Sequence, residues 1–227
     1  LGVIYNALKQ PEKGFEYFRQ AYLLDPRDHW YHYALLLYKN DDKHSRKELL
    51  AVMKQATRLN PKDASVWDYM RQAALVNGKY NQAIQAQDRI DQLQGYDGMS
   101  AINRYRIYVI QGDLKKAMCA IDDYLVLYPD DLRFLLFRAD LLTAIQAPTD
   151  QLLENYEHIL RIDPANLMIL NNYAYLLATS GGDLRKAEQM SQQTIREQPE
   201  NPTFLDTYAW ILHLQGQDSL AAFYIRK

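Results

Sequence analysis

The chain has 227 residues, 48% of them hydrophobic and 24% charged, which excludes an intrinsically disordered polypeptide and allows a sizeable core. Its formal net charge of -2 gives no electrostatic support for a nucleic-acid partner, and no apolar run reaches the roughly 20 residues of a membrane-spanning helix. The single cysteine, Cys119, excludes an intrachain disulfide.

Five prolines recur along the chain, and each follows a run with helical periodicity. Their successive separations are 35, 68, 35 and 35 residues, and 68 is twice 34. The five are Pro26, Pro61, Pro129, Pro164 and Pro199. Because proline cannot continue a helix and disfavours the helical conformation in the residue before it, these positions predict five regularly spaced helix ends.

Four glycines lie about midway between the predicted helix ends: Gly78, Gly112, Gly181 and Gly216. Glycine readily adopts the left-handed conformation that closes a helix. Gly78, within the sequence WDYMRQAALVNGKYNQA, therefore predicts a tight turn between two antiparallel helices.

Polar residues near these turns predict where the following helices begin. Asp113 and Asp183 stand where a carboxylate can cap a helix N-terminus. Where glycine is missing, residues 45–48 (Ser-Arg-Lys-Glu) form a capping-box pattern, and Pro148 falls at a plausible first helical turn.

Residues 64–97 carry Trp67, Gly78, Tyr80 and Ala83 after Pro61, and in this pattern they resemble the tetratricopeptide repeat. Ala83, Ala117, Ala187 and Ala221 share one slot of the second helices, where a small side chain allows close packing. The resemblance implies an all-α, superhelical α-α solenoid forming a single array over residues 1–227. The array has about seven helix-turn-helix units, the first and last incomplete, at 1–28, 29–63, 64–97, 98–131, 132–166, 167–201 and 202–227.

The fourth unit departs from this pattern. Arg104 and Tyr105 occupy slots in which the family prefers leucine and a small residue, and the proline expected near position 95 is absent. We expect an irregular junction near 94–98, with an altered stacking angle or a longer turn.

Candidate reactive groups have structural explanations. His29 and His32 share a helical face without further ligands at metal-site spacing, and Cys119 is expected to be a small core residue. Two of three acidic pairs fall in turns, where aspartate caps helices; the pairs are Asp41-Asp42, Asp122-Asp123 and Asp130-Asp131. We predict no catalytic, metal or cofactor site, and a chain that is not an enzyme.

The family resemblance implies that a protein or peptide partner binds to the concave face built by the first helix of each unit. The residues predicted there are Trp30, Tyr33, Leu37, Asp68, Gln72, Ile102, Arg106, Arg133, Leu136, Asp140, Asn171, Tyr175, Asp206 and Trp210. The aromatic members have an equally good alternative role in packing neighbouring helices. One subgroup of the family clamps a peptide carboxylate with Lys and Asn four residues apart, and no pair here matches that pattern.

The phrases NNYAYLLA and LDTYAW in the last two units resemble the C-terminal repeats of Gram-negative bacterial proteins of this family, many of them exported or lipid-anchored. This resemblance favours a periplasmic or envelope location over a cytoplasmic one.

Three hypotheses for function follow. The leading one is a non-catalytic scaffold that binds a peptide or partner protein in the concave groove. The alternative is a regulatory or substrate-docking segment of a larger enzyme or envelope assembly, suggested by the incomplete first and last units. A third is self-association through uncapped ends.

Overall fold

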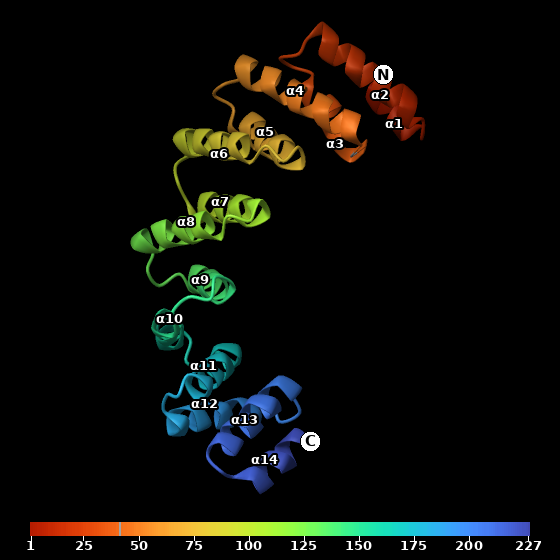
Figure 1. The fold of residues 1–227 in the computed structure, drawn as a ribbon. Coiled ribbons are helices and arrows are strands. Elements are labelled where there is room, and N and C mark those ends of the chain that lie inside the picture. Colours follow the sequence, from red (N-terminus) through yellow and green to blue (C-terminus); the bar gives the residue numbers. More distant parts are fainter. Residues whose placement is uncertain (41) are drawn as a thin grey trace. The chain divides into compact units, whose positions relative to one another are not determined.

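The computed structural model describes residues 1–40 and 42–227, and within them it contains fourteen helices and no strand (Figure 1). The predicted all-α repeat fold is confirmed. The helices are α1 (Gly2–Ala7), α2 (Pro11–Leu24), α3 (Trp30–Asn40), α4 (Lys43–Leu59), α5 (Ala64–Val76), α6 (Tyr80–Gln94), α7 (Gly98–Gln111), α8 (Leu114–Leu127), α9 (Leu132–Ala144), α10 (Thr149–Ile162), α11 (Leu167–Thr179), α12 (Leu184–Glu197), α13 (Pro202–Leu214) and α14 (Asp218–Ile225).

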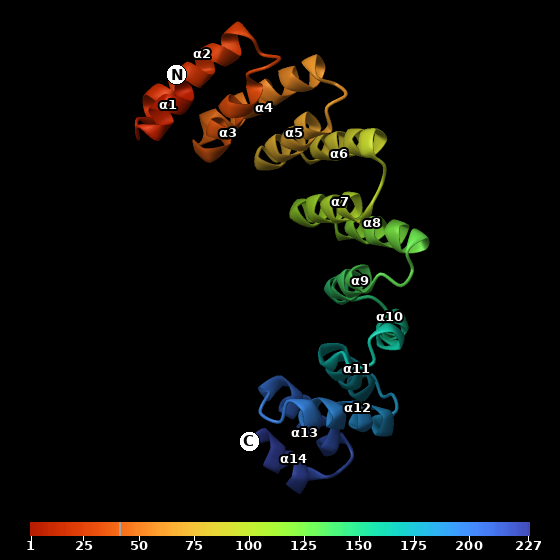
Figure 2. The ribbon, with the colours of Figure 1, turned by 180° about the vertical axis from the view of Figure 1, so that it is seen from behind.

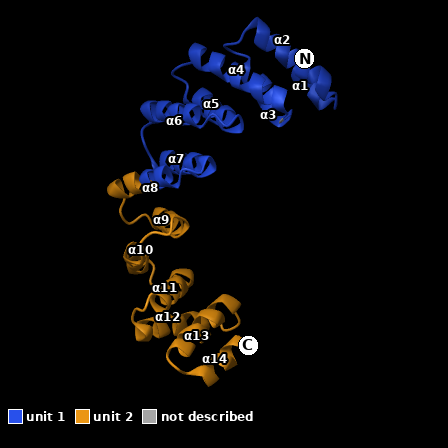
Figure 3. Cartoon of the chain, in the orientation of Figure 1, with its two compact units in different colours: residues 1–120 blue, residues 121–227 orange. Residues whose placement is uncertain are grey.

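Each helix packs mainly against its neighbours in sequence, as expected of stacked repeats. Within a repeat, the first helix packs on the second, as α5 does on α6, α11 on α12 and α13 on α14. The second helix of a repeat, such as α4 or α12, also contacts the first helix of the next repeat. Figure 2 shows the same succession from behind. The chain divides into two compact units, Leu1–Ala120 and Ile121–Lys227, with the boundary inside α8 (Figure 3). A single continuous array over 1–227 stays a prediction.

Three of the first helices, α3, α11 and α13, share one core register, with apolar or small side chains at positions i, i+3, i+4 and i+7. In α11 these are Leu170, Tyr173, Ala174 and Leu177, and all four are buried. The same spacing recurs in α13 with Leu205, Tyr208, Ala209 and Leu212, and in α3 with Trp30, Tyr33, Ala34 and Leu37. The small residue at i+4 allows close approach of a neighbouring helix, which larger side chains then surround.

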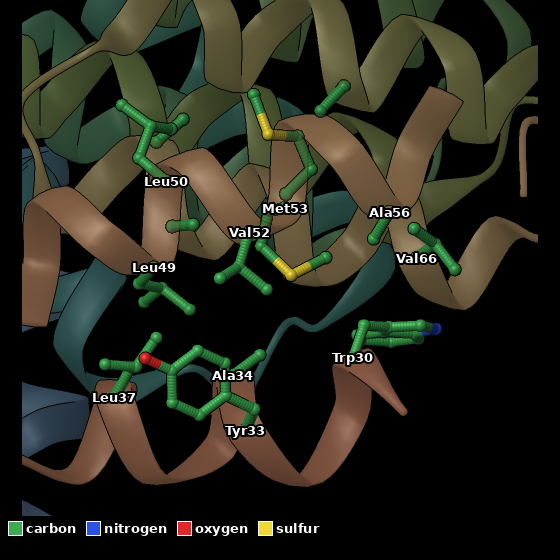
Figure 4. Packing of buried hydrophobic residues seen from close by; sticks show 14 of the residues in the cluster. Trp30, Tyr33, Ala34, Leu37, Leu49, Leu50, Val52, Met53, Ala56 and Val66 are labelled. Atoms are coloured by element: carbon green, nitrogen blue, oxygen red, sulfur yellow. The ribbon is translucent and has the colours of Figure 1, made fainter. Parts of the chain in front are cut away.

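Side chains of α3 and α4 meet in the core of the first unit. Figure 4 shows Tyr33, Ala34 and Leu37 facing Leu49 and Val52. The alanines predicted to share a slot in the second helices, Ala83, Ala117, Ala187 and Ala221, are all buried. The packing role assigned to them from the sequence is therefore confirmed.

The predicted turn at Gly78 is also confirmed. Gly78 has a φ angle of 64° and lies between α5 and α6. A Cβ atom there would meet nothing within 4 Å, so the backbone conformation, and not lack of space, requires glycine. Between α9 and α10, where glycine is absent, Gln146 adopts a φ angle of 52°.

The capping predictions are confirmed in part. Asp113 accepts a hydrogen bond from the Lys116 amide at 3.1 Å, and Asp183 accepts one from the Arg185 amide at 2.9 Å. The predicted capping box at residues 45–48 is wrong. Asp42 caps α4 instead, and its carboxylate binds the amides of the second and third helical residues.

The junction near 94–98 is shorter than the others, so the longer turn suggested by the sequence is wrong. Only residues 95–97 separate α6 from α7, whereas four residues separate α4 from α5 and α10 from α11. Gly95, with a φ angle of 95°, reverses the chain, and Asp97 caps α7 by accepting the Ser100 amide at 2.9 Å. The sharp reversal and the immediate cap replace the proline turn.

Helices α6 and α7 contact each other through a polar network centred on Arg104. Its guanidinium binds Asp88 at 2.7 Å and also pairs with Asp91. Gln87, only 1% exposed, donates to Asp91 at 2.8 Å and accepts from Asn103 at 3.1 Å. Arginine therefore stands where the family prefers leucine because α6 supplies carboxylates opposite it.

Candidate binding face on the first helices

Two positions on each first helix lie outside the core register. The first outward position directly follows the first core residue, and the second outward position lies four residues later, on the same helical face. From α3 to α13, the first outward position holds Tyr31, Asp68, Ile102, Leu136, Asn171 and Asp206. The second holds Leu35, Gln72, Arg106, Asp140, Tyr175 and Trp210.

The second outward position is accessible wherever its residue was predicted to face a partner. Tyr175 is 50% exposed and Trp210 is 44% exposed. Arg106 and Asp140 are also exposed, and Gln72 is half-buried. These residues can touch a partner, and such contact stays a prediction.

The first outward position is more often covered. Asp206 is exposed and Asp68 is half-buried, but Ile102 and Asn171 are buried. Asn171 is only 3% exposed, so its predicted role on a binding face is wrong. Helix α11 packs against both α12 and α13, and this packing leaves the amide side chain no access to solvent.

The residues predicted for the face on α3 are also wrong. Trp30 and Tyr33 belong to the core register, and Tyr33 is 1% exposed. Trp30 is the first residue of α3, whereas Trp67, at the same point of the register, is the fourth residue of α5. The face predicted on α3 therefore lies two residues too late, and the first outward position of this helix holds the exposed Tyr31.

An aromatic cluster in the first unit follows from this corrected register. The Tyr69 ring lies edge-on to both Trp30 and Tyr31, each with a centroid distance of 5.4 Å. A hydrogen bond with Tyr31, together with burial, raises the pKa of Tyr69 to about 12. Nearby, Asp68 pairs with Arg71 and accepts from the Gln72 amide at 2.8 Å, so its charge is already compensated.

The second unit presents aromatic and acidic side chains together. Tyr175 and Trp210 occupy the same outward position on α11 and α13, and Asp206 lies one turn before Trp210. Among the described residues, neither Asp206 nor Asp140 takes part in an ion pair. Arg133, at the start of α9, does have a partner, because it binds Asp131 at 3.3 Å.

The candidate reactive groups occupy separate structural sites. No group of three or more histidine, cysteine, aspartate or glutamate side chains in residues 1–40 and 42–227 could hold a metal ion. Cys119 is exposed on α8, so its predicted core position is wrong; Ala117, Ala120 and Ile121 form the buried side of that helix.

The acidic pairs follow the predicted structural pattern where they are described. Asp131 caps α9, Asp122 binds Arg138 at 2.8 Å and Asp130 binds His158 at 2.7 Å. Asp41 lies outside the described residues. Among the helices of the described part, none is long and apolar enough to cross a membrane.

Comparisons with known proteins bear on the fold. No family model matches the sequence, and a search of curated proteins found no match. Similar solved structures are those of tetratricopeptide-repeat proteins and of MamA. A tetratricopeptide repeat protein from Parabacteroides merdae superimposes with a TM-score of 0.56 and 18% identity, covering 87% of this chain and 77% of its own.

Two further structures show the same likeness. MamA from Desulfovibrio magneticus RS-1 gives a TM-score of 0.57 and 16% identity, covering 72% of this chain and 91% of its own. YrrB, described as a tetratricopeptide-repeat protein with an unusual peptide-binding site, gives 0.51 and 18%, covering 88% and 97%. At these identities the likeness concerns the fold alone, and at that level the predicted resemblance is confirmed.

Proposed function

We propose that this chain, which has the tetratricopeptide-repeat fold, is a non-catalytic scaffold that binds an extended peptide or a segment of a partner protein. The binding surface lies on the outward positions of the first helices. In the second unit it is formed by Asp140, Tyr175, Asp206 and Trp210.

One observation carries this proposal: the same outward position is exposed in three successive repeats of the second unit and holds Asp140, Tyr175 and Trp210. Large aromatic side chains cost free energy when left in water, and aromatic residues are typical anchors of protein interfaces. The core of α11 and α13 is already complete without Tyr175 and Trp210, because the i, i+3, i+4 and i+7 residues fill it. The two exposed rings are therefore available to a partner.

The peptide-binding site named for YrrB supports the proposal by analogy of fold. Outward positions that recur from repeat to repeat suit an extended ligand, because each successive repeat offers one side chain for the ligand to contact. The proposal assigns the chain a binding role and no chemical step.

The test is selection of a phage-displayed library of random peptides on the wild-type protein, followed by isothermal titration calorimetry with the selected peptides. The double variant Tyr175→Ala/Trp210→Ala should bind them at least about tenfold more weakly, because each aromatic anchor contributes roughly 1–2 kcal/mol or more. Both side chains are exposed, so the variant is expected to keep its fold, and circular dichroism checks this.

Phe223→Ala is the matched control, since Phe223 is an exposed aromatic residue on the second helix α14. This control should bind like the wild type. Equal affinities for wild type and double variant, or failure of the wild type to select any peptide, would remove the proposed face.

A further inference from the structure

We infer that the ligand of the second unit is a peptide carrying a lysine or arginine side chain, which lies against the rings of Trp210 and Tyr175 and pairs with the Asp206 carboxylate. This inference rests on the proposed function, because it names the chemistry of the ligand for the same face.

The three side chains lie on two helices in contact. Asp206 and Trp210 are four residues apart on α13, a spacing that brings Cβ atoms to about 5–6 Å. Tyr175 holds the equivalent position on α11, which packs against α13. All three are exposed, so a single elongated side chain from a partner can reach the carboxylate and a ring face together.

The charges around this face favour a cationic ligand. Helices α11 and α13 contain no lysine or arginine, and Asp140 adds a second carboxylate without an ion-pair partner in the described part of the chain. Arg133 at the start of α9 is already engaged, because it binds Asp131 and lies over the Phe134 ring at 5.4 Å. His213, whose ring lies 5.6 Å from Trp210, is held by Asp218 at 2.6 Å.

Competing ligands fit these groups less well. A purely apolar peptide would cover the Asp206 carboxylate without supplying a hydrogen-bond donor, which costs roughly 1–3 kcal/mol or more. An acidic peptide would bring like charges together over α13. A lysine or arginine side chain instead pairs with the carboxylate and gains about 0.5–2 kcal/mol from each ring face it covers.

The experiment uses the peptides selected on the full wild-type chain. We expect lysine or arginine to be enriched at one position of the selected sequences. The best peptide is then synthesised with its original basic residue, with glutamine and with glutamate at that position. By calorimetry, glutamine should weaken binding about tenfold and glutamate more strongly, and higher salt should weaken only the original peptide appreciably.

Asp206→Asn should remove the preference, so that the basic and glutamine peptides bind within about threefold of each other. Asp123→Asn, which neutralises an exposed carboxylate on the second helix α8, is the control and should keep the preference.

Selected peptides without basic residues, or a preference that survives Asp206→Asn, would overturn the inference. If such peptides still lose affinity for Tyr175→Ala/Trp210→Ala, the proposed function stands and only the ligand chemistry is wrong. If wild type selects nothing, or the double variant binds as well as wild type, both fail.

Discussion

Gly78 lies in the turn between α5 and α6 with a φ angle of 64°, and no atom would contact an added Cβ within 4 Å. Substitution there changes backbone strain alone. We expect Gly78→Ala to lower the free energy of unfolding by roughly 1–2 kcal/mol, because alanine disfavours the left-handed region. Urea unfolding followed by circular dichroism measures the loss.

Gly78→Asn is the control for this experiment. Asparagine tolerates the left-handed region better than alanine, so the loss should be clearly smaller. Equal losses for the two variants would mean that some contact, and not the backbone conformation, makes glycine necessary.

The roles of single residues follow from the sequence where their cause is local. Gly78, Asp113 and Asp183 act on the few residues beside them, and their roles were predicted correctly. Asn171 and Cys119 were misplaced because their burial depends on which neighbouring helix covers them. A polar amide is buried on α11 and an apolar thiol is exposed on α8, and neither outcome is visible in a helical period alone.

At the scale of elements, the contact between α6 and α7 depends on Arg104. Its guanidinium binds Asp88 and Asp91, and the Asp91 side chain is largely buried. Arg104→Ala would leave Asp91 without its cation. We expect a loss of about 2–4 kcal/mol in the free energy of unfolding, measured by urea unfolding.

Lys116→Ala is the matched control for the Arg104 variant. Lys116 also pairs with an aspartate, Asp113, at 3.0 Å, but it is more than half exposed, so its removal should cost clearly less stability than the removal of Arg104. A loss for Arg104→Ala no larger than this control would show that the network contributes little to the joint.

Helix positions were predictable because prolines and glycines recur at fixed intervals, but the register of α3 does not follow from these intervals. After the turn at Pro26, helix α3 begins at the core residue Trp30, whereas α5 begins three residues before the equivalent residue, Trp67. The fragment Trp30, Tyr33, Ala34, Leu37 repeats the spacing of Leu170, Tyr173, Ala174, Leu177. Aligning these core residues, and not the prolines, would have identified Tyr31.

At the scale of the whole molecule, tyrosine ionisation should limit stability in alkali. Seven tyrosines distributed over both units have raised pKa values: Tyr22, Tyr33, Tyr69, Tyr124, Tyr156, Tyr173 and Tyr208. Burial is the main cause for six of them, and for Tyr69 it is the hydrogen bond with Tyr31. Folding therefore favours the neutral phenol at these positions.

Because the folded-state pKa lies above the unfolded value near 10, this contribution is complete below about pH 10 and is lost as the pH rises through the folded values, about 12 for Tyr69. Urea midpoints should fall above pH 10, and tyrosinate absorbance should show two populations among the 18 tyrosines. A single transition near pH 10 with helicity retained would contradict the expectation.

The polar contact between α6 and α7 has a consequence for local unfolding of the first unit, in which these two helices separate. When stacked helix pairs separate at an apolar contact, they expose apolar surface to water, and such surface promotes aggregation. Here the separating faces carry Gln87, Asp91, Ser100 and Arg104, groups that water solvates readily. A transient opening at this joint therefore exposes these polar groups to water together with the apolar Ile107 of α7, which packs in the same core as Ala86, so the newly exposed surface is mixed and not wholly apolar.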